Sequence, residues 1–263
     1  MTDGLKVHRQ DAVLRLTLAD DASRNSLSED MIAGLTQHFN EANDDETLNV
    51  IIIAAEGKTF SSGHNLKELT LHRTDNDQGL AYFRQIFESC AKLMTTIAHH
   101  RCVTIAEVQG LASAAGCQLV ASCDFAYASE HATFCTPGVN IGLFCSTPMV
   151  ALSRSISLRH AREMLLSGAI YDAQYALRVG LINEVVAQDD LSARVSVVAA
   201  ELAQKSQTAI HFGKPAFDAQ RSLSLEDAYA ECTAVMVENM MNPSAREGIS
   251  AVLEKRKPDW TSL

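Results

Sequence analysis

The chain has 263 residues, a hydrophobic fraction of 47% and a formal net charge of −10. This composition allows a full buried core, and we expect one main domain with an appendage. The acidic balance argues against nucleic acid as a partner, no apolar run is long enough to span a membrane, and the opening Met-Thr-Asp-Gly does not resemble a signal peptide. The seven cysteines form no CxxC pair and the nine histidines show no metal-ligand spacing, so we expect reduced thiols, no metal site and a cytoplasmic protein.

The first part of the chain alternates strand-like and helix-like segments. Leu14, Leu16 and Leu18 alternate with polar residues, which predicts a half-buried strand. Residues 26–29 have the spacing of a capping box, and the apolar residues that follow recur with a helical period. The β-branched run at residues 50–54 predicts a strand buried on both faces.

Further along, a polar loop at residues 74–78 precedes a long helix, one face of which is formed by Phe83, Ile86, Phe87, Cys90, Met94 and Ile97. Strands are predicted at residues 103–108 and 125–128, with a small-residue turn and a helix between them. From Pro148 onward the pattern is helical, apart from a short strand at residues 182–186. We therefore predict an α/β core at residues 1–195 and a helical oligomerisation region at residues 196–263.

Two segments lead from a strand into a helix through small or polar residues. From Gly110, small residues without a charge lead into a helix-like segment that starts near Ala115, and residues 60–69 read Phe-Ser-Ser-Gly-His-Asn-Leu-Lys-Glu-Leu. A helix start of this kind presents free backbone N–H groups and the positive end of the helix dipole to a ligand. Two such places, each offering one N–H group, suit the negative charge of a developing thioester enolate.

In this order and spacing, several segments resemble the crotonase (enoyl-CoA hydratase/isomerase) superfamily. The matching segments are residues 13–39, 60–69, 108–124, 137–142, 180–186 and 247–260. Residues 117–124 and 138–147 resemble one subgroup of that family more closely. The resemblance implies a spiral of ββα units with a C-terminal helical trimerisation region, and a homotrimer or a hexamer of two trimers. It also implies a lyase of fatty acid metabolism that acts on coenzyme A thioesters and needs no cofactor of its own.

The resemblance assigns the oxyanion hole, by matching position, to the backbone N–H groups of His64 and Ala115. Hydratases of the family use two glutamates as acid and base, and their positions are occupied here by Gln118 and Gly138. Neither residue exchanges a proton near neutral pH. We therefore expect efficient hydration by the two-glutamate route to be lost, although Gln118 can still orient a water molecule through hydrogen bonds.

Other side chains could replace the acid and base that the two absent glutamates would supply. The His64 imidazole either titrates near neutrality or only fills space. Cys145 and Ser146 lie on a loop expected to face the acyl chain, where they either act as nucleophile in a thioester hydrolase or only pack and position water. Glu107 lies inside a strand, where its carboxylate either faces a subunit boundary or has a perturbed pKa.

The resemblance also places coenzyme A contacts in three stretches of the chain. The residues are Arg24, Asn25, Ser26, Leu27, Ser62, His64, Asn65, Leu66, Lys67, Lys255 and Lys257. The cluster at residues 255–257 either binds phosphates of coenzyme A across a subunit boundary or complements a helix end. Three functions stay open: an enolate-stabilising enoyl-CoA hydratase/isomerase-like enzyme, a thioester hydrolase, and a non-catalytic acyl-CoA binder or scaffold.

Overall fold

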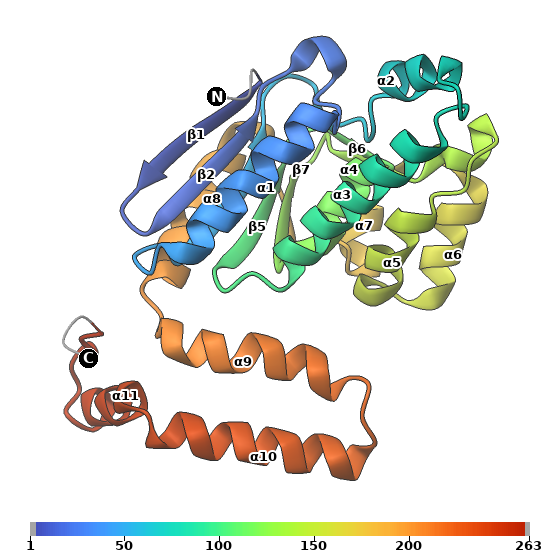
Figure 1. The fold of residues 1–263 in the computed structure, drawn as a ribbon. Coiled ribbons are helices and arrows are strands. Elements are labelled where there is room, and N and C mark those ends of the chain that lie inside the picture. Colours follow the sequence, from blue (N-terminus) through green and yellow to red (C-terminus); the bar gives the residue numbers. More distant parts are fainter. Residues whose placement is uncertain (1–3, 261–263) are drawn as a thin grey trace. The chain divides into compact units, whose positions relative to one another are not determined.

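The computed structural model describes residues 4–260, and the chain divides into two compact units, Met1–Ala200 and Glu201–Leu263. The first unit contains two β-sheets with helices packed around them, as the sequence predicts (Figure 1). The second unit is helical.

The larger sheet of the first unit has six strands in the order β1-β2-β3-β5-β7-β10. Their bounds are β1 (Leu5–Gln10), β2 (Val13–Leu18), β3 (Val50–Ala55), β5 (Val103–Val108), β7 (Phe125–Ser129) and β10 (Glu184–Val186). Strands β1 and β2 pair antiparallel, and the remaining neighbours pair in parallel. The strands predicted from alternation and from β-branched runs are confirmed, since parallel strands covered on both faces need such apolar runs.

The smaller sheet has four strands in the order β4-β6-β8-β9. Their bounds are β4 (Thr59–Ser61), β6 (Leu111–Ser113), β8 (Thr133–Cys135) and β9 (Tyr171–Asp172). Strand β6 lies where the sequence indicated only a small-residue turn. These strands are too short to show an alternating pattern, so their pairing depends on contacts between segments distant in the chain.

Helices cover both faces of the larger sheet, with α1 and α3 on one side and α8 on the other (Figure 1). The helices of the first unit are α1 (Glu29–Asp44), α2 (Leu66–Leu71), α3 (Leu80–Ala98), α4 (Ala115–Ser122), α5 (Ser146–Ser155), α6 (Leu158–Ser167), α7 (Ala173–Val179) and α8 (Leu191–Ala203). Short 3₁₀ helices are η1 (Asp21–Ser23), η2 (His72–Thr74), η3 (Pro137–Ile141) and η4 (Gln188–Asp190).

The start of α1 differs from the capping box predicted at residues 26–29. Ser28 is the N-cap, and its side chain accepts a hydrogen bond of 3.2 Å from the Met31 N–H. The Ser26 hydroxyl is buried without a hydrogen-bond partner among residues 4–260, and Leu27 forms a parallel bridge with His64. The prediction was wrong because pairing with the His64 segment holds residues 26–27 extended and delays the helix.

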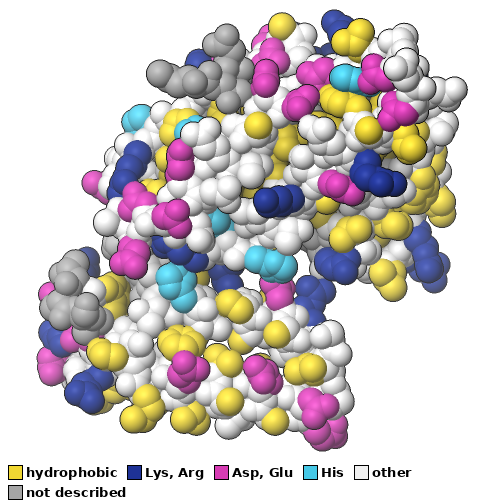
Figure 2. Space-filling model, in the orientation of Figure 1, with side chains coloured by type: hydrophobic (Ala, Val, Ile, Leu, Met, Phe, Trp, Pro, Cys, Tyr) yellow, Lys and Arg dark blue, Asp and Glu magenta, His cyan; other side chains and the backbone are white. Residues whose placement is uncertain are grey.

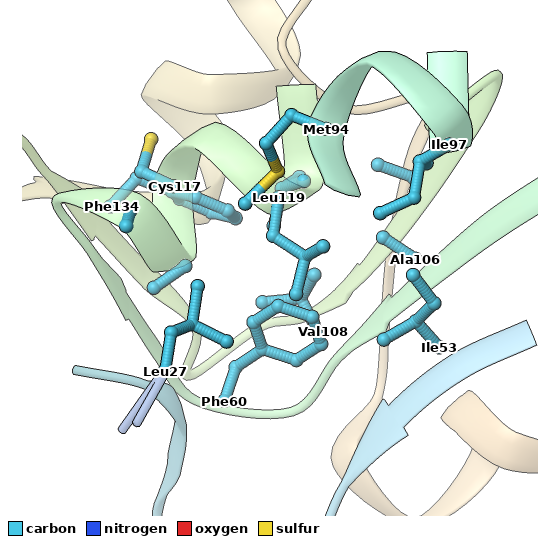
Figure 3. Packing of buried hydrophobic residues seen from close by; sticks show 14 of the residues in the cluster. Leu27, Ile53, Phe60, Met94, Ile97, Ala106, Val108, Cys117, Leu119 and Phe134 are labelled. Carbon is cyan, nitrogen blue, oxygen red and sulfur yellow. The ribbon is translucent and has the colours of Figure 1, made fainter. Parts of the chain in front are cut away.

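The core of the first unit lies between the larger sheet and the helices α1, α3 and α4. Leu27, Phe60 and Cys117 belong to one buried cluster, so segments that lead into both predicted hole donors are anchored in the same core (Figure 3). The predicted face of α3 is buried at Ile86, Cys90, Met94 and Ile97. Phe87 was wrongly assigned to this face, because its side chain is 38% exposed.

The second unit consists of α9 (Gln207–Gln220), α10 (Leu225–Met241) and α11 (Pro243–Leu253). The indole N–H of Trp260 donates to the Gln204 carbonyl at 2.9 Å, and Arg256 forms ion pairs with Glu247 and Glu254. Hydrophobic side chains are exposed along these helices (Figure 2). The large ones include Phe217, Leu225, Tyr229, Met236, Val237, Met240, Met241, Val252 and Leu253. Across residues 4–260, no helix combines the length and apolar character needed to cross a membrane.

Candidate active site

The first segment of the site leaves β4, passes through Ser62 and Gly63, and enters α2. Gly63 has a φ of 86°, a left-handed conformation that favours glycine. Asn65 caps α2, and its side chain accepts a hydrogen bond of 3.1 Å from the Lys67 N–H. This turn places the His64 N–H just ahead of a helix start, as the sequence indicated.

The second segment leaves β6, passes through Ala114 and enters α4 at Ala115. Ala114 has φ 50° and ψ −114°, which is strained for a residue with a Cβ and costs about 1–3 kcal/mol. Its N–H donates to the Cys135 carbonyl at 2.9 Å, so strand β8 helps to hold the strained turn. The peptide that carries the Ala115 N–H is therefore fixed by pairing on one side and by the helix on the other.

The two segments pack backbone against backbone, with glycines where they meet. A methyl group added at Gly63 would lie 3.0 Å from the Ser113 carbonyl oxygen and 3.2 Å from the Ala115 nitrogen. One added at Gly116 would overlap the Ser61 carbonyl oxygen. Within the described part of the chain, the N–H groups of His64 and Ala115 donate no hydrogen bond. An oxyanion hole needs two such unpaired donors close together.

The His64 side chain is enclosed beside the first donor. Its ring meets that of Phe87 edge to face, with 5.2 Å between the centroids. Neither ring nitrogen makes a hydrogen bond within residues 4–260. Burial lowers the pKa of His64, and the backbone of Leu27 offsets part of that shift. The imidazole is therefore neutral near pH 7 and is a weaker base than an exposed histidine.

Gln118 lies on α4 and is 4% exposed. Its Oε1 atom is buried without a hydrogen-bond partner in the described residues, and so is Oγ1 of Thr136, which precedes η3. A buried polar atom left unpaired costs stability unless water or a ligand satisfies it. Thr136 was missed by the sequence reasoning, since a single threonine between a cysteine and a proline carries no recognisable pattern.

Gly138 lies in η3 in front of the loop that leads to α5. A methyl group added there would lie 2.8 Å from the Leu143 carbonyl oxygen and 3.0 Å from the Cys145 sulfur. The space that a side chain at position 138 would enter is therefore filled by the following loop. At the position where the sequence resemblance places a second glutamate, the adjoining space holds a thiol and a backbone carbonyl.

Cys145 is 8% exposed, and burial raises the pKa of its thiol, although the Gly138 backbone offsets part of this. Such a thiol is protonated near neutral pH and is a poor nucleophile. Ser146 is exposed at the start of α5, and its hydroxyl donates to the Phe144 carbonyl at 3.4 Å. Cys117 and Cys135 also have raised pKa values, mainly through burial.

Glu107 lies away from these groups. Its carboxylate pairs with Arg15 at 2.7 Å, and the same guanidinium donates to the hydroxyl of Ser196 on α8. This pair therefore belongs to the face of the larger sheet that α8 covers. Among the described residues, no cluster of histidine, cysteine or carboxylate side chains could hold a metal ion.

The residues expected to contact coenzyme A differ in accessibility. Arg24, Leu66 and Lys67 are exposed beside the first segment, whereas Asn25 and Leu27 are fully buried. Lys255 and Lys257 lie in the second unit and flank Arg256, whose charge is already paired with Glu247 and Glu254. The structure thus brings residues 24–27 and 62–67 together, through hydrogen bonds from Leu27 N–H to Gly63 O and from Ser62 N–H to Arg24 O.

Comparisons with known proteins match nearly the whole chain. The family model described as enoyl-CoA hydratase/isomerase matches residues 8–262. The mitochondrial enoyl-CoA hydratase domain-containing protein 3 of Xenopus laevis is 45% identical over 255 residues, which cover 97% of this chain and 85% of that protein.

Solved structures agree with this assignment. The crystal structure of human enoyl-CoA hydratase domain-containing protein 3 has a TM-score of 0.92 at 43% identity and covers 98% of this chain and 100% of that chain. An enoyl-CoA hydratase of Mycobacterium smegmatis has a TM-score of 0.91 at 41% identity and covers 98% of both chains. The α/β fold and the resemblance predicted from the sequence are confirmed, including the subgroup, which is the domain-containing protein 3 group.

Proposed function

Because the chain belongs to the enoyl-CoA hydratase/isomerase family, we propose that it binds an acyl-CoA and stabilises the enolate of its thioester. The donors are the backbone N–H groups of His64 and Ala115. Such a preorganised donor contributes about 3–4 kcal/mol to a transition state that carries oxyanion charge.

One observation carries this proposal: the two unpaired amides lie on touching segments that only glycine at position 63 allows to meet. Backbone donors that no group of the described residues satisfies are available to a ligand, and their presence on both segments favours one that accepts from them. The strained turn at Ala114 supports the same reading, since local backbone strain is found where a peptide must be aimed at a ligand.

Coenzyme A fits the exposed cations beside this pair of amides. Arg24 and Lys67 are exposed on the loops that carry residues 24–27 and 62–67, and both side chains suit phosphate oxygens. Against a net charge of −10, these local cations are needed to attract an anionic ligand. Because the Asn25 side chain is buried, only the backbone of its loop is available to contact the ligand there.

The two-glutamate hydration route is not supported for this chain. Gln118 offers an amide oxygen that accepts a hydrogen bond but takes up no proton, and the space in front of Gly138 is filled. Each missing general acid or base lowers a rate by about 10²–10⁴-fold. The proposed enzyme therefore stabilises an enolate without a carboxylate pair, and any hydration that depends on Gln118 and water alone is slow.

Thioester hydrolysis is the less favoured alternative, because burial raises the pKa of Cys145 and holds its thiol protonated. A non-catalytic acyl-CoA binder uses the same amides and cations, and it differs from the proposed enzyme only in giving no product.

We also infer that the second unit mediates self-association into trimers or hexamers. Its exposed apolar side chains include Tyr229 at 70%, Met236 at 68% and Val252 at 77%, and surfaces of this kind are typical of subunit interfaces. Sedimentation analysis of wild type and Met236→Glu tests this, with Glu231→Gln on the same helix as control. The cytoplasmic location stays a prediction, and cell fractionation tests it against the mitochondrial location in the name of the Xenopus relative.

The experiment that tests the proposed function is isotope-edited infrared spectroscopy of crotonyl-CoA labelled with carbon-13 at the thioester carbonyl. Two donors on the oxygen lower the carbonyl stretching frequency of the bound ester relative to the free ester. The same samples are followed by mass spectrometry for hydrated, shifted or hydrolysed products. Absence of binding, or a bound carbonyl with the frequency of the free ester, would overturn the proposal, whereas binding with a lowered frequency and no product would indicate the non-catalytic alternative.

A further inference from the structure

We infer that Asn25 is a positioning residue for the oxyanion hole: its buried carboxamide ties the turn at residues 24–25 to the loop before β4 and thereby fixes the His64 N–H. The inference rests on the proposed function. It also gives Asn25 a role other than the coenzyme A contact that the sequence resemblance implied, since its side chain is 0% exposed.

The first element is a turn held in an unusual backbone conformation. Arg24 and Asn25 have successive φ angles of 58° and 50°, a left-handed conformation that asparagine tolerates better than most residues. The turn is closed by the Asn25 N–H on the Asp20 carbonyl at 2.7 Å and by the Asp20 N–H on Asn25 Oδ1 at 2.8 Å. The side chain thus stabilises its own strained backbone.

The second element is the pair of bonds that the Asn25 amide nitrogen donates. Nδ2 donates to the Glu56 carbonyl at 2.9 Å and to the Thr59 carbonyl at 2.7 Å. These carbonyls stand at the two ends of the tight loop between β3 and β4, where Gly57 has a φ of 79°. One carboxamide therefore sets both where β3 ends and where β4 begins.

The third element carries this restraint to the hole. The Ser62 N–H donates to the Arg24 carbonyl at 3.1 Å, and the Leu27 N–H donates to the Gly63 carbonyl at 2.8 Å. On the first segment the bonded residues, Arg24 and Leu27, lie on either side of Asn25. On the second segment they are Ser62 and Gly63, directly before His64. The peptide that presents the His64 N–H is consequently held by the loop whose shape depends on Asn25. No part of this chain of contacts requires Asn25 to touch the ligand.

The test compares Asn25→Asp and Asn25→Ala with wild type, using crotonyl-CoA labelled at the thioester carbonyl. Asn25→Asp keeps the shape and the Oδ1 acceptor, but it replaces the two donated bonds with a carboxylate facing two carbonyl oxygens. We expect most of the lowering of the carbonyl frequency to be lost in both variants. The affinity for coenzyme A itself, which has no thioester carbonyl, is measured in the same variants, because the turn at residues 24–25 also carries Arg24 and a change in the coenzyme A contacts must be separated from a change in carbonyl polarisation.

Asn183→Ala is the matched control. The Asn183 side chain accepts a hydrogen bond of 2.8 Å from the Ala126 N–H and ties the segment before β10 to β7, without a link to the His64 segment. This variant is expected to lose thermal stability while keeping the wild-type carbonyl frequency. A purely structural role for Asn25 predicts the same behaviour, so Asn25 variants with lowered stability but an unchanged carbonyl frequency would overturn the inference.

A milder variant covers the case in which neither Asn25 variant folds. Ser62→Ala removes only the 3.3 Å hydrogen bond from the Ser62 hydroxyl to the Ser23 carbonyl, at the outer end of the same set of contacts. A partial return of the carbonyl frequency toward the free value would support the inference, and a wild-type frequency would overturn it. If wild type itself shows no lowered frequency, the proposed function fails, whereas a lowered frequency retained in every variant removes the role of Asn25 alone.

Discussion

Gly63 and Ala115 approach so closely that a single methyl group on Gly63 would lie 3.2 Å from the Ala115 nitrogen. In the proposed hole, the N–H groups of His64 and Ala115 bind one thioester oxygen, which requires the two segments to touch. The added methyl group would lie at that contact. It would also place a Cβ on a backbone with a φ of 86°. Position 63 therefore constrains the site in two independent ways.

Gly63→Ala is expected to lose most of the carbonyl polarisation of bound acyl-CoA and to cost about 1 kcal/mol or more of folding free energy. Gly180→Ala is the control, because Gly180 has a φ of 82° and nothing within 4 Å of the added methyl group. Infrared spectra and urea unfolding of both variants separate the two effects. Equal carbonyl frequencies in both would show that the contact with Ala115 does not shape the hole.

Introducing glutamates at positions 118 and 138, where the sequence resemblance places the acid and base of family hydratases, is expected not to create an efficient hydratase. In Gln118→Glu combined with Gly138→Glu, the second side chain meets the Leu143 carbonyl and the Cys145 sulfur, and such overpacking costs about 1–3 kcal/mol. Hydration of crotonyl-CoA and the urea midpoint are measured beside Gln118→Glu alone. Gly213→Glu is the control for adding a glutamate in place of a glycine, since nothing lies within 4 Å at that helical position. A large gain in hydration by the double variant would contradict the filled space.

The Cys145 thiol is expected to resist alkylation. Because burial raises its pKa and limits access to its thiol, we expect iodoacetamide to modify it more slowly than the partly exposed Cys232. Peptide mass spectrometry over time gives both rates, and urea-unfolded protein gives the rates without burial. Rapid labelling of Cys145, together with thioester cleavage lost in Cys145→Ala, would favour the hydrolase alternative.

Stability is expected to fall as the pH drops below the ordinary histidine pKa of 6.5, in part through His64. Burial lowers the pKa of the folded ring, so the unfolded chain binds the proton first and is favoured at lower pH. The contribution of one such group grows by at most about 1.4 kcal/mol for each pH unit below that value. Urea unfolding of wild type and His64→Gln at equal protein concentration measures the difference in slope. Parallel curves for the two proteins would show that the folded ring takes up its proton normally.

The larger sheet could be predicted from the sequence, because its strands are apolar runs whose burial shows directly in residue type. Strand β6 could not be predicted, because it has only three residues, Leu111–Ser113, and its pairing is decided by distant segments. The start of α1 was missed for the same reason: Leu27 pairs with His64, and a contact between loops overrides a local capping pattern. Short elements thus depend on tertiary context more than long ones.

The site divides in a similar way. The donors at His64 and Ala115 were assigned by matching position in the family resemblance, which is possible because backbone donors do not depend on side-chain identity, and their role stays a prediction. The position of Cys145 against Gly138 depends on how a loop folds back over seven residues of chain, which no spacing rule describes. The interior position of Asn25 was also missed, since a polar residue in a loop is ordinarily exposed.

The two amides of the candidate hole come from two strand-to-helix turns, one between β4 and α2 and the other between β6 and α4. Local unfolding of either turn would remove one of the two donors while most of the larger sheet stays folded. Binding of the ligand therefore requires both turns to be folded at the same time. A ligand that accepts from both amides therefore raises the opening free energy of two separate regions together. Hydrogen exchange would then slow in β4 and β6 by a common factor on adding acyl-CoA, and the ligand would act as a thermodynamic link between them.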